Sequence, residues 1–138
     1  MRNQDLAGDY VRRAEARLKA VDVLFDAESW ADVVRESQEI VELALKGLLR
    51  ALGIEAPRIH DVSDILTSEQ DRMPEKLRPQ VARLARISKQ LRRDRELAFY
   101  GSEDLTPSDF YSREDATEAR SGALSTVRVV KPFVPGAG

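Results

Sequence analysis

The densest cluster of side chains that could do chemistry lies between positions 76 and 95, where eight basic residues accompany one acid, Asp94. At the helical rotation of about 100° per residue, four of the basic residues fall on one side, opposite an apolar stripe. These four, here called the basic row, are Arg83, Arg86, Lys89 and Arg93. Such a row predicts either a solvated helix face or a surface that follows the phosphates of RNA or another polyanion.

Arg95 does not belong to this row, because it shares the helical phase of the apolar stripe. It follows Leu91 by four residues and Leu84 by eleven. Burying a guanidinium on such a face without a partner is energetically costly. We therefore expect Arg95 either to line a polar site near a carboxylate or bound anion, or to extend past the helix end into water.

Few other residues offer catalytic chemistry. His60 is the single histidine, and the adjacent Asp61 could fix its tautomer for general-acid catalysis, although a lone histidine more often has a structural role. The absence of cysteine excludes disulfides, thiolate metal sites and cysteine nucleophiles. No glycine-rich phosphate loop is present, and the acids after position 102 fit a loop and a helix start. We predict no metal site and no cofactor.

The composition limits the class of protein. Of 138 residues, 42% are hydrophobic and 33% are charged, and the formal net charge is −2. This hydrophobic content is enough for a folded core, and the balanced charge gives no bulk attraction to nucleic acid or membrane. No apolar run approaches the roughly 18 residues of a membrane span, and the N-terminus lacks a signal-peptide core. We expect a soluble cytoplasmic protein with no membrane partner.

Four long amphipathic segments must position these side chains. Apolar residues recur at helical spacing over about residues 5–27, 30–52, 75–98 and 113–131. Ser29 is a candidate N-cap of the second helix, and Gly53 is its candidate C-terminal stop.

The long connection between the second and third helices has the pattern of a short helix, capped by Asp61 or Ser63. The sequence therefore predicts an all-α fold, an up-and-down bundle of four main helices plus this short helix. We expect one domain over residues 1–131 and a flexible C-terminal tail over residues 132–138.

The second and last helices suggest how the chain assembles. The second helix is apolar around more than half of its circumference, which predicts a central position, and Glu42 and Lys46 on its remaining edge have the spacing of an ion pair. The inner face of the last helix consists of small residues, which allow close approach of a helix from this chain or from another. Because one chain of this size has little surface to cover both faces, we predict a homodimer.

Several segments resemble HEPN domains, whose name abbreviates higher eukaryotes and prokaryotes nucleotide-binding. The pattern of residues 37–49 with Gly53 resembles the second helix of that family, and residues 10–14 with Leu18 resemble the first helix. Residues 60–62, residues 95–101 and the pair Asp115 and Ala116 extend the resemblance over about residues 5–131.

The resemblance implies a helical bundle that is usually a homodimer. It also implies that many members are metal-independent ribonucleases, often toxins paired with a small nucleotidyltransferase antitoxin. The family's catalytic signature is an arginine followed, after four to six residues, by a histidine near the dimer interface. Arg95 matches the arginine, whereas Tyr100 occupies the window in which the histidine is expected.

Three functions follow from this reading. The first is a dimeric nucleotide- or RNA-binding module with weak or no catalytic activity, partnered with a nucleotidyltransferase, in which Lys46, Arg86, Arg93 and Arg95 bind the ligand. The second is a metal-independent ribonuclease toxin that uses Arg95 with Tyr100 or His60. The third is an interaction module without a ligand.

Overall fold

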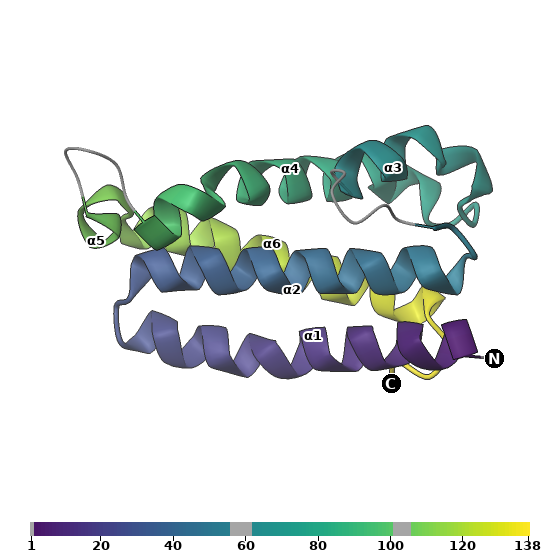
Figure 1. Ribbon diagram of the computed structural model, residues 1–138, viewed down its shortest axis with the longest axis horizontal. Helices are drawn as coiled ribbons and strands as arrows, with labels where there is room; N and C mark the ends of the chain where they lie inside the picture. The colour runs from purple at the N-terminus through teal and green to yellow at the C-terminus, as the bar shows by residue number, and fades with distance from the viewer. Residues whose placement is uncertain (1, 56–61, 101–105) are drawn as a thin grey trace.

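The computed structural model describes the backbone of residues 2–55, 62–100 and 106–138, and the side chains of residues 4–55, 62–92 and 106–138. Its long helices are α1 (Arg2–Asp26), α2 (Trp30–Ala51), α4 (Arg78–Tyr100) and α6 (Arg113–Val130). The shorter elements are α3 (Val62–Ser68), η1 (Gln70–Arg72), α5 (Pro107–Phe110) and η2 (Lys131–Phe133), where η denotes a 3₁₀ helix. Figure 1 shows the four long helices lying side by side along one axis.

The prediction of an all-α bundle is confirmed, and the described residues contain no strand. The four long helices lie where the sequence predicts them, and the expected short helix is α3, whose Leu66 is fully buried. α4 begins at Arg78 rather than near Glu75, because residues 75–77 form a turn. Pro79 therefore still lies in the first helical turn, where its missing N–H costs little. None of the described helices combines the length and apolar character needed to cross a membrane.

α2 occupies the centre of the bundle, in contact with α1, α4 and α6. Its large apolar side chains are completely buried, as the wide apolar surface of its sequence predicts. Ile40, Leu45, Leu48 and Leu49 each have 0% of their surface exposed. Burial of each such side chain contributes about 1.5–3 kcal/mol to folding, so this helix supplies a large part of the core.

Gly47 lets α1 and α2 approach closely. A side-chain carbon at this position would lie 2.9 Å from Val11 Cγ2 and 3.0 Å from the Ala7 carbonyl oxygen. The second of these is backbone of α1, which cannot move away without shifting the helix. The α1–α2 packing therefore requires glycine at position 47.

The two ends of α2 lie where the sequence predicts them, but only one forms for the predicted reason. Gly53 has φ +71°, and its N–H donates to the Arg50 carbonyl at 3.0 Å. Glycine favours this left-handed conformation at helix ends. Ser29 precedes the helix without capping it, because its hydroxyl donates to Asp32 Oδ2 at 2.6 Å and accepts no backbone N–H.

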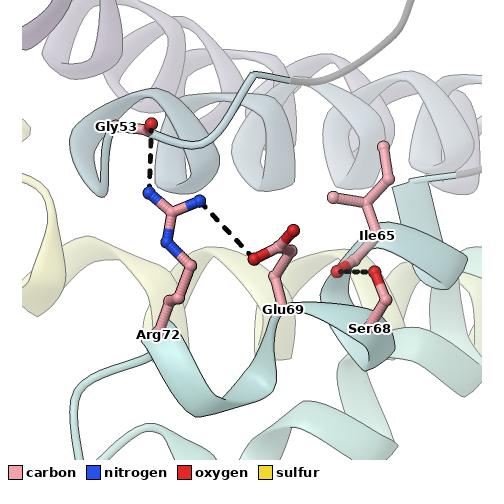
Figure 2. A network of polar contacts seen from close by, with 5 residues as sticks. All are labelled: Gly53, Ile65, Ser68, Glu69 and Arg72. Carbon is pink, nitrogen blue, oxygen red and sulfur yellow. Dashed lines mark hydrogen bonds and ion pairs between the residues drawn. The ribbon is translucent and has the colours of Figure 1, made fainter.

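Figure 2 shows how the corner after α2 is fixed. Arg72 lies in η1, and its guanidinium donates to the Gly53 carbonyl at 3.5 Å and contacts Glu69 Oε2 at 3.5 Å. The hydroxyl of Ser68, the last residue of α3, donates to the Ile65 carbonyl at 3.2 Å. The chain that leads into α4 is thereby tied to the end of α2.

The small-residue face of α6 is covered within the chain. Ala116, Ala119, Ala123 and Val127 are all buried, and α6 packs along α2. The argument that one chain could not cover this face was wrong, because α2 is apolar enough to pack against α1 and α6 at once. The homodimer itself stays a prediction.

Residues 132–138, which we expected to be flexible, pack onto α1. Val134 and Ala137 are buried, and Arg12 Nη1 donates to the Gly136 carbonyl. Gly8 makes room for this segment, because a side-chain carbon there would lie 2.9 Å from the Pro135 carbonyl oxygen. The apolar side chains of the tail and the glycine on α1 together give the segment a place in the core.

Candidate functional site

A pocket lies between α4 and α6, with one residue of α2 in its lining. Its volume is about 300 Å³, at the lower end of the range for small-molecule sites. The helices approach closely where a side-chain carbon at Gly122 would lie 3.1 Å from Ile87 Cγ2. The lining consists of Val34, Arg86, Ile87, Gln90, Leu91, Tyr111, Asp115, Glu118, Ala119 and Gly122.

The two helical walls of the pocket carry opposite charges. Arg86 is an exposed side chain on α4, and Glu118 is an exposed side chain on α6. In the part of the chain that the structure describes, neither has a hydrogen-bond or ion-pair partner, and they do not pair with each other. A ligand between the walls would therefore meet one free cation and one free carboxylate.

Asp115, the second acid of the lining, is already engaged in the start of α6. Its Oδ2 accepts from the Ser112 backbone N–H at 2.9 Å and from the Ser112 hydroxyl at 3.0 Å, and its own N–H donates to that hydroxyl at 3.3 Å. This reciprocal arrangement is a capping box, with aspartate in the place of the usual glutamate or glutamine. Asp115 thus both caps the first turn of α6 and lines the pocket.

A polar seam crosses from α2 to α4 beside the apolar core. Glu42 lies 3.7 Å from Arg92 and accepts from Gln38 Nε2 at 3.3 Å. The expected pair of Glu42 with Lys46 does not form, because Arg92 on the neighbouring helix takes the carboxylate. Gln38 is 3% exposed, and its Oε1 has no hydrogen-bond partner in the described structure. The seam lies one turn from Val34 on α2 and next to Leu91 on α4, both of which line the pocket.

The described part of the basic row lies on the solvent side of α4, as the helical phase predicts. Arg83, Arg86 and Lys89 are exposed, and Lys89 Nζ lies 3.3 Å from Asp64 Oδ1 of α3. Arg86 is the member of the row that lines the pocket.

Lys46, which we expected to bind the ligand, is not part of the pocket lining. It follows Val34 by twelve residues on α2, which is about 18 Å along the helix axis. This distance separates Lys46 from the Val34 side of the pocket.

The predicted catalytic residues fall at the edge of the described structure. Arg93, Arg95 and Tyr100 belong to the last two turns of α4, but their side chains lie outside the described residues. Arg95 follows Leu91 of the pocket by one helical turn. His60 lies outside the described residues altogether. Their roles stay predictions.

Of the ten residues that line the pocket, the sequence predicted only Arg86 as a site residue. No role was predicted for Tyr111, Glu118 or Gly122, which the fold brings into the lining. The capping-box spacing of Ser112 and Asp115 marks where α6 begins, but packing decides which face of the helix meets α4. Among the described residues, no three histidine, aspartate or glutamate side chains gather as metal ligands.

Comparison with known proteins identifies the family. The model of the HEPN domain matches residues 7–131, from α1 to η2. Putative toxin MJ1304 of Methanocaldococcus jannaschii is 29% identical over 131 residues, which cover 91% of this chain and 86% of that protein. No solved structure matches the chain. The sequence resemblance is thereby confirmed, and the chain belongs to the HEPN domain family.

Proposed function

We propose that this HEPN chain is a dimeric nucleotide- or RNA-binding protein with weak or no catalytic activity. The observation that carries the proposal is the pocket on α4, whose lining includes the unpaired Arg86 of the basic row. A small pocket beside a row of cations suits a nucleotide, because one unit of the ligand is enclosed while its phosphates lie along the row.

The order of residues along α4 supports one continuous site. Arg86, Gln90 and Leu91 line the pocket, and Arg93 and Arg95 follow within the next turn of the same helix. A strand of RNA that enters the pocket at Arg86 could continue along α4 past Arg93. Arg95 then has the role of a ligand-binding residue.

The proposal of weak or no catalysis rests on the chemistry of the motif. A ribonuclease without a metal needs a side chain that exchanges protons near neutral pH. Tyr100 stands where the family's signature has histidine, and a tyrosine hydroxyl ordinarily ionises only near pH 10. RNA binding survives this replacement, whereas efficient cleavage does not.

A metal-independent ribonuclease toxin is the second candidate function. The relative named Putative toxin MJ1304 favours it, because the match covers most of both chains. In that case Arg95 acts with Tyr100 or with His60, and a nucleotidyltransferase is the partner that controls the activity.

The test measures whether the full chain binds total RNA and whether that RNA stays intact. We expect RNA to bind at low salt, affinity to fall steeply as salt rises, and the RNA to stay intact. The double variant Arg86→Glu with Arg93→Glu should abolish binding. The matched control, Lys19→Glu with Arg128→Glu, reverses two exposed charges on α1 and α6 and should leave most of the binding.

Two results would overturn the proposal. If the parent protein binds no RNA at low salt, the basic row is a solvated face. If it degrades RNA and Arg95→Ala stops the degradation, the ribonuclease function is correct instead.

A further inference from the structure

The size and charge of the pocket restrict what it can hold. A volume of about 300 Å³ accommodates one small ligand rather than several linked units. The lining contains one cation, Arg86, against two acids, Asp115 and Glu118. Such a lining disfavours a ligand with many negative charges and favours one that combines a single anionic group with hydrogen-bond donors.

The two charged walls can each satisfy one part of such a ligand. The guanidinium of Arg86 has no partner within the described chain, and it can bind a phosphate through two parallel N–H groups. The carboxylate of Glu118 is also without a partner there, and it can only accept hydrogen bonds when ionised. Asp115 is less available, because Ser112 already donates two hydrogen bonds to it. Glu118 is therefore the acceptor that a base would meet.

A free carboxylate distinguishes between the four bases. Its two oxygens accept best from two adjacent donors, as in its bidentate pairing with arginine. On its Watson–Crick edge guanine offers such a pair, the N1–H and the 2-amino group. Adenine and cytosine each place an acceptor nitrogen next to their amino group, and uracil has one N–H between two carbonyls. The apolar side chains Ile87, Leu91 and Ala119 can pack against the face of the ring.

We propose that this pocket selects a guanine nucleotide, with Glu118 accepting from the guanine edge and Arg86 binding the phosphate. The inference rests on the proposed function, since it assumes that the pocket takes a nucleotide. It makes Glu118 the residue that determines base specificity.

The experiment is calorimetric titration of the full chain with GMP, IMP and AMP at low salt. IMP lacks only the 2-amino group of GMP, so the comparison isolates the second hydrogen bond to Glu118. GMP should bind at least about fivefold more tightly than IMP or AMP, the lower limit for a bidentate contact to a base. Glu118→Gln should remove the preference for GMP over IMP and improve AMP, because an amide presents one donor beside one acceptor.

Matched variants separate this inference from general effects of charge. Glu114→Gln removes an exposed carboxylate one turn earlier on α6, outside the pocket lining, and should keep the preference for GMP. Arg86→Ala should lower the affinity for GMP to that for guanosine. Because Glu118 is exposed, its variant is expected to fold, which circular dichroism verifies.

The outcomes distinguish failure of the inference from failure of the proposed function. If GMP, IMP and AMP bind equally, or if Glu118→Gln keeps the preference, the guanine assignment is wrong and nucleotide binding stands. If RNA binds but no mononucleotide does, the pocket is not the base site. If neither RNA nor any nucleotide binds, both proposals fail.

Discussion

At the scale of single residues, Arg95 connects the fold to the proposed function. Unless Arg95 extends past the helix end into water, its position one turn after the buried Leu91 leaves two physical roles, pairing with a buried acid or binding a ligand. The two roles differ in what the loss of the guanidinium costs. Stranding a buried acid would destabilise the fold by about 3–5 kcal/mol, whereas an open ligand site needs the arginine only when the ligand is present.

We expect Arg95→Ala to abolish RNA binding while the free energy of unfolding changes by less than about 1 kcal/mol. Urea denaturation monitored by circular dichroism measures the second quantity. Leu91→Ala provides the reference for a true core loss, because this 5%-exposed side chain should cost about 2–5 kcal/mol. An Arg95→Ala variant as unstable as Leu91→Ala would assign the arginine to the structure instead.

Glycine 47 provides a second test at this scale, since it concerns the contact between α1 and α2. Gly47→Ala gains up to about 1 kcal/mol of helix propensity but forces a carbon against the Ala7 carbonyl at 3.0 Å. Overpacking of this kind costs about 1–3 kcal/mol, so we expect a net loss of stability.

Gly122→Ala is the matched control, because its new carbon would meet only the side chain of Ile87, at 3.1 Å, and no backbone atom. It should be close to neutral in the same urea titration. Equal midpoints for the two variants would contradict the assignment of Gly47 as the closest approach of the helices.

At the scale of elements, α6 shows how a local signal builds part of the site. The capping box of Ser112 and Asp115 fixes where the helix begins, and the packing of α6 on α2 decides which of its residues face the pocket. The buried alanines then hold α6 against α2, while Glu118 stays on the α4 side. A substitution at the cap should therefore lower the free energy of unfolding more than it changes ligand binding.

We expect Ser112→Ala to lower the free energy of unfolding by about 1 kcal/mol, since two backbone N–H groups at the helix start depend on the capping box. Ser29→Ala should change it much less, because the Ser29 hydroxyl bonds only to the Asp32 side chain. Thermal or urea unfolding of the two variants compares a real cap with a residue that only occupies a cap position. A larger loss for Ser29→Ala would reverse this assignment.

At the scale of the whole molecule, the chain covers its own main apolar faces. α1, α4 and α6 surround α2, and the C-terminal residues pack on α1. The exposed large apolar side chains of the described residues are Leu6, Val23, Phe110 and Leu124. They lie on α1, α5 and α6 rather than on α2. A second copy of the chain would therefore have to bind through surfaces other than the apolar face of α2 and the small-residue face of α6, from which the homodimer was predicted.

The homodimer nevertheless stays our expectation, because it belongs to the proposed function. Multi-angle light scattering at micromolar concentration should give twice the chain mass of 15.5 kDa. A mass of one chain over the whole micromolar range would show a monomer.

The sequence by itself determined the helices, because the signals that form them are local. The apolar period of the four long segments, Gly53 after α2 and the exposed side of the basic row all depend on residues within a few turns. The resemblance to the HEPN family was also recognisable from short segments of the sequence, because the family pattern follows the helices from residue 7 to residue 131.

Only the tertiary structure decided which surfaces meet, because helix packing joins residues that are distant in the sequence. It paired Glu42 with Arg92 instead of Lys46, covered the alanines of α6 with α2, and placed residues 134–137 on α1. The pocket exists only because α4 and α6 lie beside each other, which brings Arg86 and Glu118 to its opposite walls. No period or motif within either helix specifies which faces of the two helices meet, and for this reason Glu118 could not be identified as a pocket residue from the sequence.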